Sequence, residues 1–246
     1  MKLLILAAGS GKRLNPFTNV LPKILVPFSD GRSLLDSLVD NSTHSGIFKE
    51  IVIVIGYGSD LIEKKIKSAY GNRGIRTVMN PEYGKSSPIF SIKVAWESIK
   101  DDDFVIINGD TYYGRSVFEK IKHAGKDIFA LLVSSPINSC KDSVSVRLDQ
   151  NRFLKKIKKG ALSDNDFISA GFLIVKGPEK RGLFGQAVDR LFNNCDLMWH
   201  DLLNKIVSEG HRVDTIPVDK SEWHEMDTPE DYERIKDFFG KRSLND

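Results

Sequence analysis

The opening of the chain, residues 2–14, constrains its fold more than any other stretch. Leu3–Leu6 is a continuous apolar run, which is typical of a central parallel strand covered on both faces. The run opens into a loop of small residues and glycines in which the backbone can approach a ligand closely. Successive N–H groups in such a turn form an anion-binding concavity. Cations follow at Arg13 and Lys23, and the whole combination suits a triphosphate.

Two common phosphate-binding motifs do not fit this loop. A Walker A motif needs Gly five positions before the Gly-Lys pair and Ser or Thr after it, but Leu6 and Arg13 occupy those positions. The dinucleotide fingerprint needs a third Gly, where this chain has Leu14. The loop alone could be an ordinary strand-to-helix turn with surface cations. The later Pro22-Lys23 pair favours a nucleotide-binding loop instead.

Composition bounds the class of protein. The 246 residues are 41% hydrophobic and 28% charged, which is typical of one α/β domain with a sizeable core. The net charge of +3 does not favour nucleic acid, and we expect the basic run 155–159 to be a solvated strand edge. The apolar N-terminus is too short for a membrane span and lacks a cleavage region. We therefore expect a cytoplasmic protein without membrane contact, with Cys140 and Cys195 as free thiols.

Strand and helix patterns alternate along the chain. Buried strands are predicted at 51–55, 76–79, 104–108, 128–134, 143–148, 153–157, 170–175 and 213–218. Helices are predicted at 33–39, 59–69, 88–99, 178–192, 200–209 and 229–239. We expect an α/β, Rossmann-like fold with a mixed, mostly parallel sheet and helices on both faces. One catalytic domain would span residues 1–246, with a nucleotide-binding part at about 1–115 and an acceptor-binding part at about 116–246.

Residues 6–14, followed by Leu21-Pro22-Lys23-Ile24-Leu25, resemble the signature of the nucleotidyltransferases that make sugar nucleotides and CDP-alcohols. The resemblance covers nearly the whole chain. It implies that Arg13 contacts the nucleotide phosphates and that Lys23 stabilises charge at the reacting phosphate. It also implies that the opening loop wraps these phosphates, through Leu6, Ala7, Ala8, Gly9, Ser10 and Gly11.

The same resemblance implies a Mg²⁺ ion at Asp110 and Asp227. Asp110 ends an apolar strand and Asp227 precedes a capped helix, and Mg²⁺ binds through one or two carboxylates plus substrate phosphates. Glu225 would point the same way in an extended segment, as a secondary ligand or orienter. Asp110 could alternatively serve only a turn, and Asp227 only a helix N-terminus. The histidines lack ligand spacing, and we expect structural roles for them: His200, His211 and His224.

The segments 80–92 and 223–228 resemble choline-phosphate-type cytidylyltransferases, which makes CTP the expected nucleotide. The expected base contacts come from backbone groups of residues 7–9 and 83–87 and from the hydroxyls of Ser86 and Ser87, and Asn80 is a further expected nucleotide-binding residue. The acceptor would be a phosphorylated small alcohol, aminoalcohol, phosphonate or sugar. An aromatic cage for a cationic head group, or alternatively ordinary packing, would involve Tyr83, Tyr112 and Trp223.

This chain departs from choline-type members in ways that leave alternatives open. It has Ser87-Pro88 where they usually carry paired Asn, and Asp110-Thr111-Tyr112 where they often have Asp-x-Asp. A sugar-1-phosphate uridylyl-, thymidylyl- or guanylyltransferase therefore stays open, as do a nucleotide-sugar-consuming glycosyltransferase and a catalytically silent regulatory subunit. A silent relative would be expected to lose one of the four charges at positions 13, 23, 110 and 227. Oligomeric state, a homodimer included, is also open.

Overall fold

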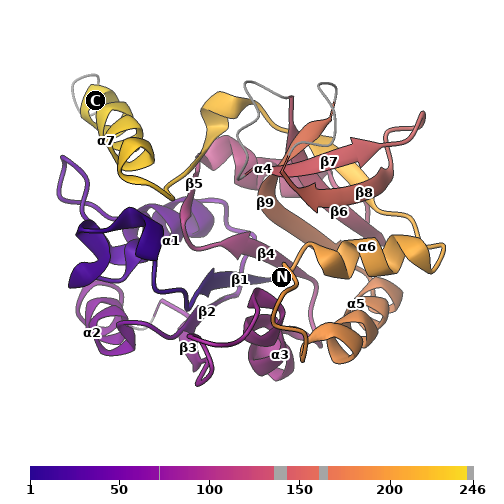
Figure 1. Cartoon of the computed structure of the whole chain (residues 1–246), viewed down its shortest axis with the longest axis horizontal. Coiled ribbons are helices and arrows are strands. Elements are labelled where there is room, and N and C mark those ends of the chain that lie inside the picture. The colour runs from indigo at the N-terminus through magenta and orange to yellow at the C-terminus, as the bar shows by residue number, and fades with distance from the viewer. Residues whose placement is uncertain (72, 136–142, 161–165, 243–246) are drawn as a thin grey trace.

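The computed structural model describes residues 1–71, 73–135, 143–160 and 166–242. Within these ranges the main sheet has nine strands, in the order β10-β6-β9-β4-β1-β2-β3, with β7 and β8 extending it beside β9 (Figure 1). A separate two-stranded ribbon pairs β5 with β11. None of the helices in the described part of the chain is both long and apolar enough to cross a bilayer.

The first half of the sheet is parallel. Its strands are β1 (Lys2–Ala7), β2 (Glu50–Ile55), β3 (Ile75–Met79) and β4 (Phe104–Asn108). β1 lies between β2 and β4, and it pairs with both in parallel register. Its residues 3–5 are fully buried, as expected of a strand covered on both faces. The carboxyl ends of these strands meet at one edge of the sheet.

The second half of the sheet is mixed. The long β9 (Phe167–Lys176) runs antiparallel to both β4 and β6 (Ile128–Ser134), whereas β10 (Asp214–Pro217) is parallel to β6. β7 (Val144–Leu148) pairs with β9 and with the edge strand β8 (Leu154–Lys159). Only Leu154 and Ile157 of β8 are buried, and its lysines are exposed. The basic run is thus a solvated strand edge, as predicted.

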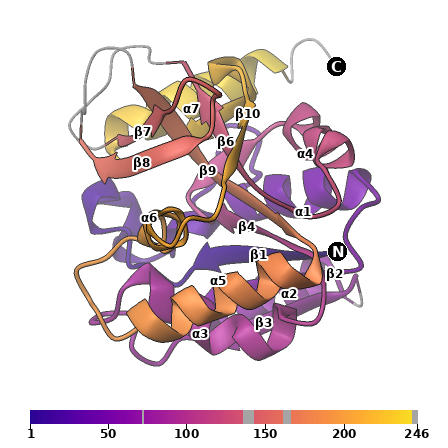
Figure 2. The ribbon, with the colours of Figure 1, turned by 90° about the vertical axis from the view of Figure 1, so that its right-hand side faces the viewer.

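Helices cover both faces of the sheet, which confirms the predicted fold class (Figure 2). One hydrophobic cluster contains Leu3 and Ile5 of β1 and the other contains Leu4, because side chains alternate across a strand. The first cluster joins the sheet to α1 (Leu34–His44), α2 (Ser59–Ala69), α4 (Arg115–His123) and α7 (Pro229–Arg242). The second joins it to α3 (Pro88–Ile99), α5 (Pro178–Leu191) and α6 (Asp201–Ser208).

Local sequence signals start the helices where they were expected. Ser33 forms a capping box with Asp36 at the start of α1. Thr228 and Asp231 exchange hydrogen bonds before α7: the Thr228 N–H donates to Asp231 Oδ2 over 2.9 Å, and the Asp231 N–H donates to Thr228 Oγ1 over 3.3 Å. Pro88 is the first residue of α3, but the Ser87 side chain does not cap that helix.

The sequence did not predict β5 (Thr111–Tyr113) or α4. β5 pairs antiparallel with β11 (Trp223–Glu225), and Glu225 lies opposite Thr111. The Met226 N–H donates to the Asp110 carbonyl over 2.9 Å and extends this contact. The ribbon therefore carries the acidic segment before α7 to the end of β4. Of the two cysteines, Cys195 is a free exposed thiol and Cys140 lies outside the described residues.

Candidate active site

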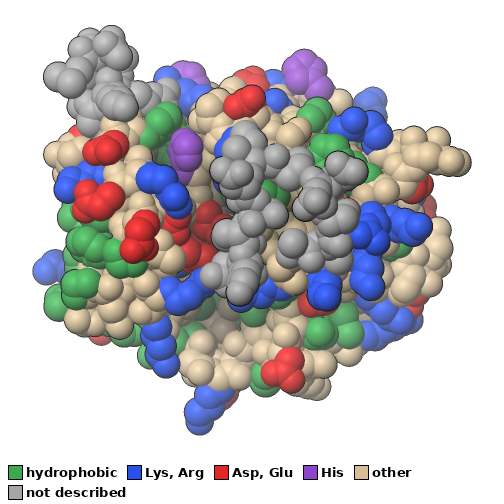
Figure 3. Space-filling view, turned by 45° about the horizontal axis from the view of Figure 1, so that its top comes forward, with side chains coloured by type: hydrophobic (Ala, Val, Ile, Leu, Met, Phe, Trp, Pro, Cys, Tyr) green, Lys and Arg blue, Asp and Glu red, His purple; other side chains and the backbone are tan. Residues whose placement is uncertain are grey.

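A pocket of about 360 Å³ opens at the carboxyl ends of β1 and β4. Figure 3 shows acidic side chains gathered at a hollow of this surface, with basic side chains beside them. Most of the predicted site residues line the pocket. These are Leu6, Ala7, Ala8, Gly9, Gly11, Arg13, Lys23, Asn80, Tyr83, Ser86, Ser87, Asp110, Glu225 and Asp227. Ser10 belongs to the same loop but is not among the lining residues.

Gly109 brings the end of β4 against the opening loop. Its N–H donates to the Leu6 carbonyl over 2.9 Å. A Cβ at this position would lie 2.7 Å from the Leu6 carbonyl oxygen and 2.9 Å from Ala7 Cβ, so any larger residue would force the two segments apart. The missing side chain therefore sets the position of the next residue, Asp110, beside the loop.

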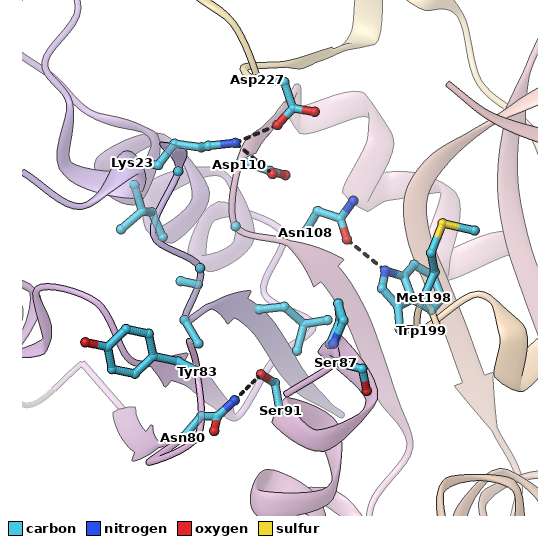
Figure 4. A pocket seen from close by; sticks show the side chains of 18 of the residues that line it. Lys23, Asn80, Tyr83, Ser87, Ser91, Asn108, Asp110, Met198, Trp199 and Asp227 are labelled. Carbon is cyan, nitrogen blue, oxygen red and sulfur yellow. Dashed lines mark hydrogen bonds and ion pairs between the residues drawn. The ribbon is translucent and has the colours of Figure 1, made fainter. Parts of the chain in front are cut away.

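Two cations and two carboxylates form a connected cluster at the pocket. Lys23 follows Pro22 in a short 3₁₀ turn, and its Nζ lies 2.6 Å from Asp227 Oδ1 and 3.2 Å from Asp110 Oδ2 (Figure 4). Arg13 donates through one guanidinium nitrogen to Asp227 Oδ2 over 2.7 Å. The structure thus brings together all four charged residues that the sequence singled out.

The surroundings of Lys23 and Asp227 favour the charged form of each. Burial alone would lower the pKa of Lys23, but the charges and hydrogen bonds of Asp110 and Asp227 outweigh it and raise that pKa above its usual value. Burial would raise the pKa of Asp227, but Lys23 and Arg13 outweigh it and lower that pKa. Glu225 behaves differently. Desolvation of its carboxyl and the charges of Asp110 and Asp227 raise its pKa, although the residue as a whole remains exposed.

Three carboxylates could hold a metal ion. Asp110, Glu225 and Asp227 each offer an oxygen, and these oxygens all lie within 4.8 Å of one another. Carboxylate oxygens are the ligands that Mg²⁺ prefers, and the two aspartates already surround a cation, the Lys23 ammonium. The donor set therefore fits a divalent cation that is shared with bound phosphates.

The far end of the pocket is lined by hydroxyl and amide groups. Asn80 follows β3 and is buried, and its side-chain nitrogen donates to Ser91 Oγ over 2.9 Å and to Ser86 Oγ over 3.2 Å. Ser87 is buried beside them. Tyr83 lies at the same end with 40% of its surface exposed. Ser91 was not predicted, because it lies within the amphipathic pattern of α3 and carries no motif of its own.

Of the two roles left open for the aromatic residues, packing rather than a cage holds for Tyr112 and Trp223. Tyr112 and Trp223 are 3% and 2% exposed and belong to the hydrophobic core, away from the pocket lining on which Tyr83 lies. The reason is the ribbon of β5 and β11, which packs both side chains inward. A cation does lie over the Trp223 ring, 3.4 Å from its centre, but it is the ammonium of Lys220 from this chain.

The opposite wall comes from a segment that the sequence did not indicate. Trp199 Nε1 donates to Asn108 Oδ1 over 2.9 Å, which ties the segment before α6 to the end of β4 (Figure 4). His200 stacks on Trp199 with ring centres 3.8 Å apart, and its Nε2 lies 2.8 Å from Ser169 Oγ. Burial lowers the pKa of His200 to about 3, so its ring is neutral. This histidine packs and hydrogen-bonds within the fold, and it also lines the pocket.

Further lining residues come from β7, β8 and the same loop before α6: Val144, Lys159 and Met198. Spacing could not reveal them, because they meet the nucleotide-facing loops only in the folded chain. The Met-Trp-His run at 198–200 was the sequence signal for this wall, because large apolar residues in a loop are more often buried than exposed.

Known proteins resemble this chain in sequence and in fold. The CMP-5'-(3-aminopropyl)phosphonate synthase of Streptomyces rubellomurinus is 24% identical over 97% of this chain. A bifunctional sugar-1-phosphate nucleotidylyltransferase/acetyltransferase of Sulfurisphaera tokodaii is 32% identical over 70% of it. The chain spans only 38% and 40% of the lengths of these two relatives.

A solved structure of CTP:phosphocholine cytidylyltransferase from Streptococcus pneumoniae superposes with a TM-score of 0.81. The superposition covers 97% of this chain and 98% of that one, at 21% identity, so it shows a shared fold. The model of the nucleotidyl transferase family matches residues 2–141, which is more than half of the chain. With the glycine loop, the paired cations and the carboxylates in place, this chain belongs to the nucleotidyl transferase family.

Proposed function

We propose that the protein transfers CMP from CTP to the phosphate of a small phosphorylated acceptor and releases pyrophosphate, in a Mg²⁺-dependent reaction. The acceptor class is a phosphorylated alcohol, aminoalcohol, phosphonate or sugar. Residues 1–115 would bind most of the nucleotide, and residues 116–246 would bind most of the acceptor. The relatives support this proposal, since several carry cytidylyl- or other nucleotidyltransferase names.

The observation that carries the proposal is the contact of Lys23 and Arg13 with Asp227, directly beside the opening loop. A protein that only binds nucleotide needs the loop and the cations. It has no need for a partly buried cation between two carboxylates, which is costly to build unless a reaction uses it. A catalytically silent subunit is therefore disfavoured.

The reaction needs positioning and charge neutralisation more than proton transfer. An anionic phosphate oxygen of the acceptor attacks the α-phosphorus of CTP. A new P–O bond forms as the bond from the α-phosphorus to the bridging oxygen breaks, and pyrophosphate leaves with the electron pair. No general base is needed, because the attacking oxygen is already deprotonated. In-line positioning and electrostatic stabilisation supply the rate enhancement.

The residues of the site fit these needs. The backbone N–H groups of residues 8–11 and the Arg13 guanidinium can face the nucleotide phosphates, and Lys23 can neutralise charge that builds up at the phosphate undergoing transfer. Asp110 and Asp227 would hold Mg²⁺, with Glu225 beside them, and the bound ion would supply further neutralisation of the triphosphate. The neutral ring of His200 orients the acceptor wall and takes no proton in this scheme.

The charges that line the pocket indicate which acceptors it would bind. The described lining includes the cation of Lys159 from β8, whereas its acidic residues, Asp110, Glu225 and Asp227, form the cluster that would hold the metal ion. Tyr112 and Trp223 are not among the lining residues. We therefore favour a hydroxylated or anionic acceptor, such as a sugar phosphate or polyol phosphate, over phosphocholine.

A matrix of nucleotides and acceptors tests the proposal. The protein is incubated with Mg²⁺, each of CTP, UTP, dTTP, ATP and GTP, and a panel of phosphorylated alcohols, aminoalcohols and sugars, and pyrophosphate release is followed. We expect release with CTP and at least one acceptor, and none without acceptor. Preference for UTP or dTTP would indicate a sugar-1-phosphate uridylyl- or thymidylyltransferase. Tight nucleotide binding without release from any pair would indicate a silent subunit.

A further inference from the structure

Ser87 has a buried hydroxyl with no hydrogen-bond partner among the described residues, and it lines the pocket. The residue is 2% exposed. A serine before a helix normally accepts a hydrogen bond from the first turn, but here the Phe90 N–H donates to the Ser87 carbonyl over 3.0 Å instead. A buried hydroxyl without a partner is costly, so this group is placed for a ligand.

Unlike the Ser87 hydroxyl, the Asn80 side chain already makes hydrogen bonds within the protein with both its nitrogen and its oxygen. Its Nδ2 donates both hydrogens, one to Ser86 Oγ over 3.2 Å and one to Ser91 Oγ over 2.9 Å. Its Oδ1 accepts from the Glu82 backbone N–H over 2.8 Å. That N–H can only donate, so it fixes which side-chain atom is the oxygen. Asn80 lines the pocket and has no donor left for a ligand.

The Asn80 amide determines whether the hydroxyls of Ser86 and Ser91 act as donors or acceptors towards the pocket. A serine hydroxyl has one hydrogen to donate. Because Ser86 and Ser91 both accept from Asn80, their hydrogens are available to the pocket, which both residues line. Figure 4 shows the bond from Asn80 to Ser91. This end of the pocket therefore presents two hydroxyls that act as donors, and a third, on Ser87, that can donate or accept.

We propose that Asn80 acts as a positioning residue that makes Ser86 and Ser91 donors, and that these two with Ser87 select cytosine. The inference rests on the proposed function and names its nucleotide-selecting residues. Cytosine offers O2 and N3 as adjacent acceptors, followed by an amino donor. Two donors and one hydroxyl that can accept complement this set of groups. Uracil carries N3–H, which would face a donor and leave both groups unpaired, and such mismatches are rejected strongly.

The variant Asn80→Asp inverts the polarity at nearly constant shape. The new carboxylate still accepts from the Glu82 N–H, but it cannot donate, so Ser86 and Ser91 must donate to it and turn their lone pairs to the pocket. We expect the ratio of Kd for UTP to Kd for CTP to fall by about tenfold or more, measured by calorimetry without acceptor. An unchanged ratio, with both nucleotides bound equally more weakly, would overturn the proposal.

Ser87→Ala tests the third hydroxyl by two independent readouts. It removes a group that has no partner in the free protein, so we expect the Tm without nucleotide to stay the same or rise. The Kd for CTP should nevertheless increase by roughly tenfold. The control is Ser68→Ala on α2, whose hydroxyl is exposed and bonds only to the Lys65 carbonyl, and which should change neither value. A lower Tm with unchanged CTP binding would make Ser87 structural and contradict the proposal.

The selection of cytosine and the proposed nucleotidyl transfer can be tested separately. If the wild-type protein turns over CTP but neither variant changes nucleotide discrimination or affinity, the selection mechanism is wrong and the proposed function stands. If the wild type binds no nucleotide, both are wrong.

Discussion

Lys23 and Asp227 are 204 positions apart in the chain, yet Nζ of one lies 2.6 Å from a carboxylate oxygen of the other. At the scale of single residues, that contact is the centre of the site. It links the turn after the opening loop to the segment before the last helix. The Lys23 ammonium lies between the carboxylates of Asp110 and Asp227. We expect loss of the lysine and loss of either carboxylate to affect catalysis in different ways.

Asp110→Asn and Asp227→Asn should each abolish most activity while the protein stays folded. Each change removes a carboxylate that would hold the divalent ion, and one such ligand is worth several kcal/mol in the transition state, or about a hundredfold or more in kcat. Turnover and Mn²⁺ affinity are measured together. Asp189→Asn is the control, since Asp189 pairs with Lys93 on the surface outside the pocket lining. Near-normal turnover of both variants at limiting Mg²⁺ would refute the metal assignment.

Lys23→Ala should lower kcat more than it raises the KM for the nucleotide. The reason is that charge at the transferring phosphate grows in the transition state, so a cation there stabilises that state more than bound substrate. Steady-state kinetics with saturating acceptor separate the two parameters. Lys85→Ala, in the loop after β3, provides a matched loss of positive charge outside the pocket lining. An effect confined to KM would make Lys23 a simple binding residue.

At the scale of elements, the site depends on how closely β4 meets the opening loop. Gly109 allows that approach, because a Cβ there would lie 2.7 Å from a backbone oxygen that cannot move away easily. Gly182 in α5 is a contrasting position, because no atom of the described residues lies within 4 Å of an added Cβ.

Gly109→Ala should therefore destabilise the protein by roughly 1–3 kcal/mol and reduce turnover as Asp110 shifts. Gly182→Ala should be neutral or should stabilise by up to about 1 kcal/mol, because alanine favours a helix interior. Urea unfolding of both variants gives the comparison. Equal stabilities would contradict the role assigned to Gly109.

The elements also show what the sequence could predict. The parallel strands were predicted because long apolar runs need burial on both faces, and α2 because its apolar spacing is helical. β5 could not be predicted, since three residues form a strand there only by pairing with β11, more than a hundred positions away. For the same reason Tyr112 and Trp223 were misplaced, and the wall of Trp199 and His200 was missed: each depends on partners that only the fold brings close.

At the scale of the whole molecule, the neutral buried His200 makes folding sensitive to acid. Its pKa is about 3 in the folded protein and near 6.5 when unfolded. At a pH between these two values, His200 is protonated in the unfolded chain and neutral in the folded protein. The free energy of unfolding therefore falls as the pH falls from about 6.5 towards 3. The expected slope from this one group is roughly 1.4 kcal/mol per pH unit.

The variant His200→Gln should lose that slope. Free energies of unfolding are measured by urea titration from pH 7 to pH 4 for both proteins, and the difference between them isolates the histidine from the titrating carboxylates. We expect the wild type to lose stability more steeply below pH 6.5. Parallel curves would show that His200 takes up its proton without unfolding.

The fate of the α- and γ-phosphorus atoms of CTP shows whether the protein transfers a nucleotidyl group. The protein is given Mg²⁺, an active acceptor, and CTP labelled with ³²P at either the α- or the γ-position, and the products are separated. Nucleotidyl transfer predicts that α-label enters the acceptor product and that γ-label appears only in pyrophosphate, with both reactions lost in Asp227→Asn. Label in the acceptor from γ-labelled CTP, or none from α-labelled CTP, would contradict the account.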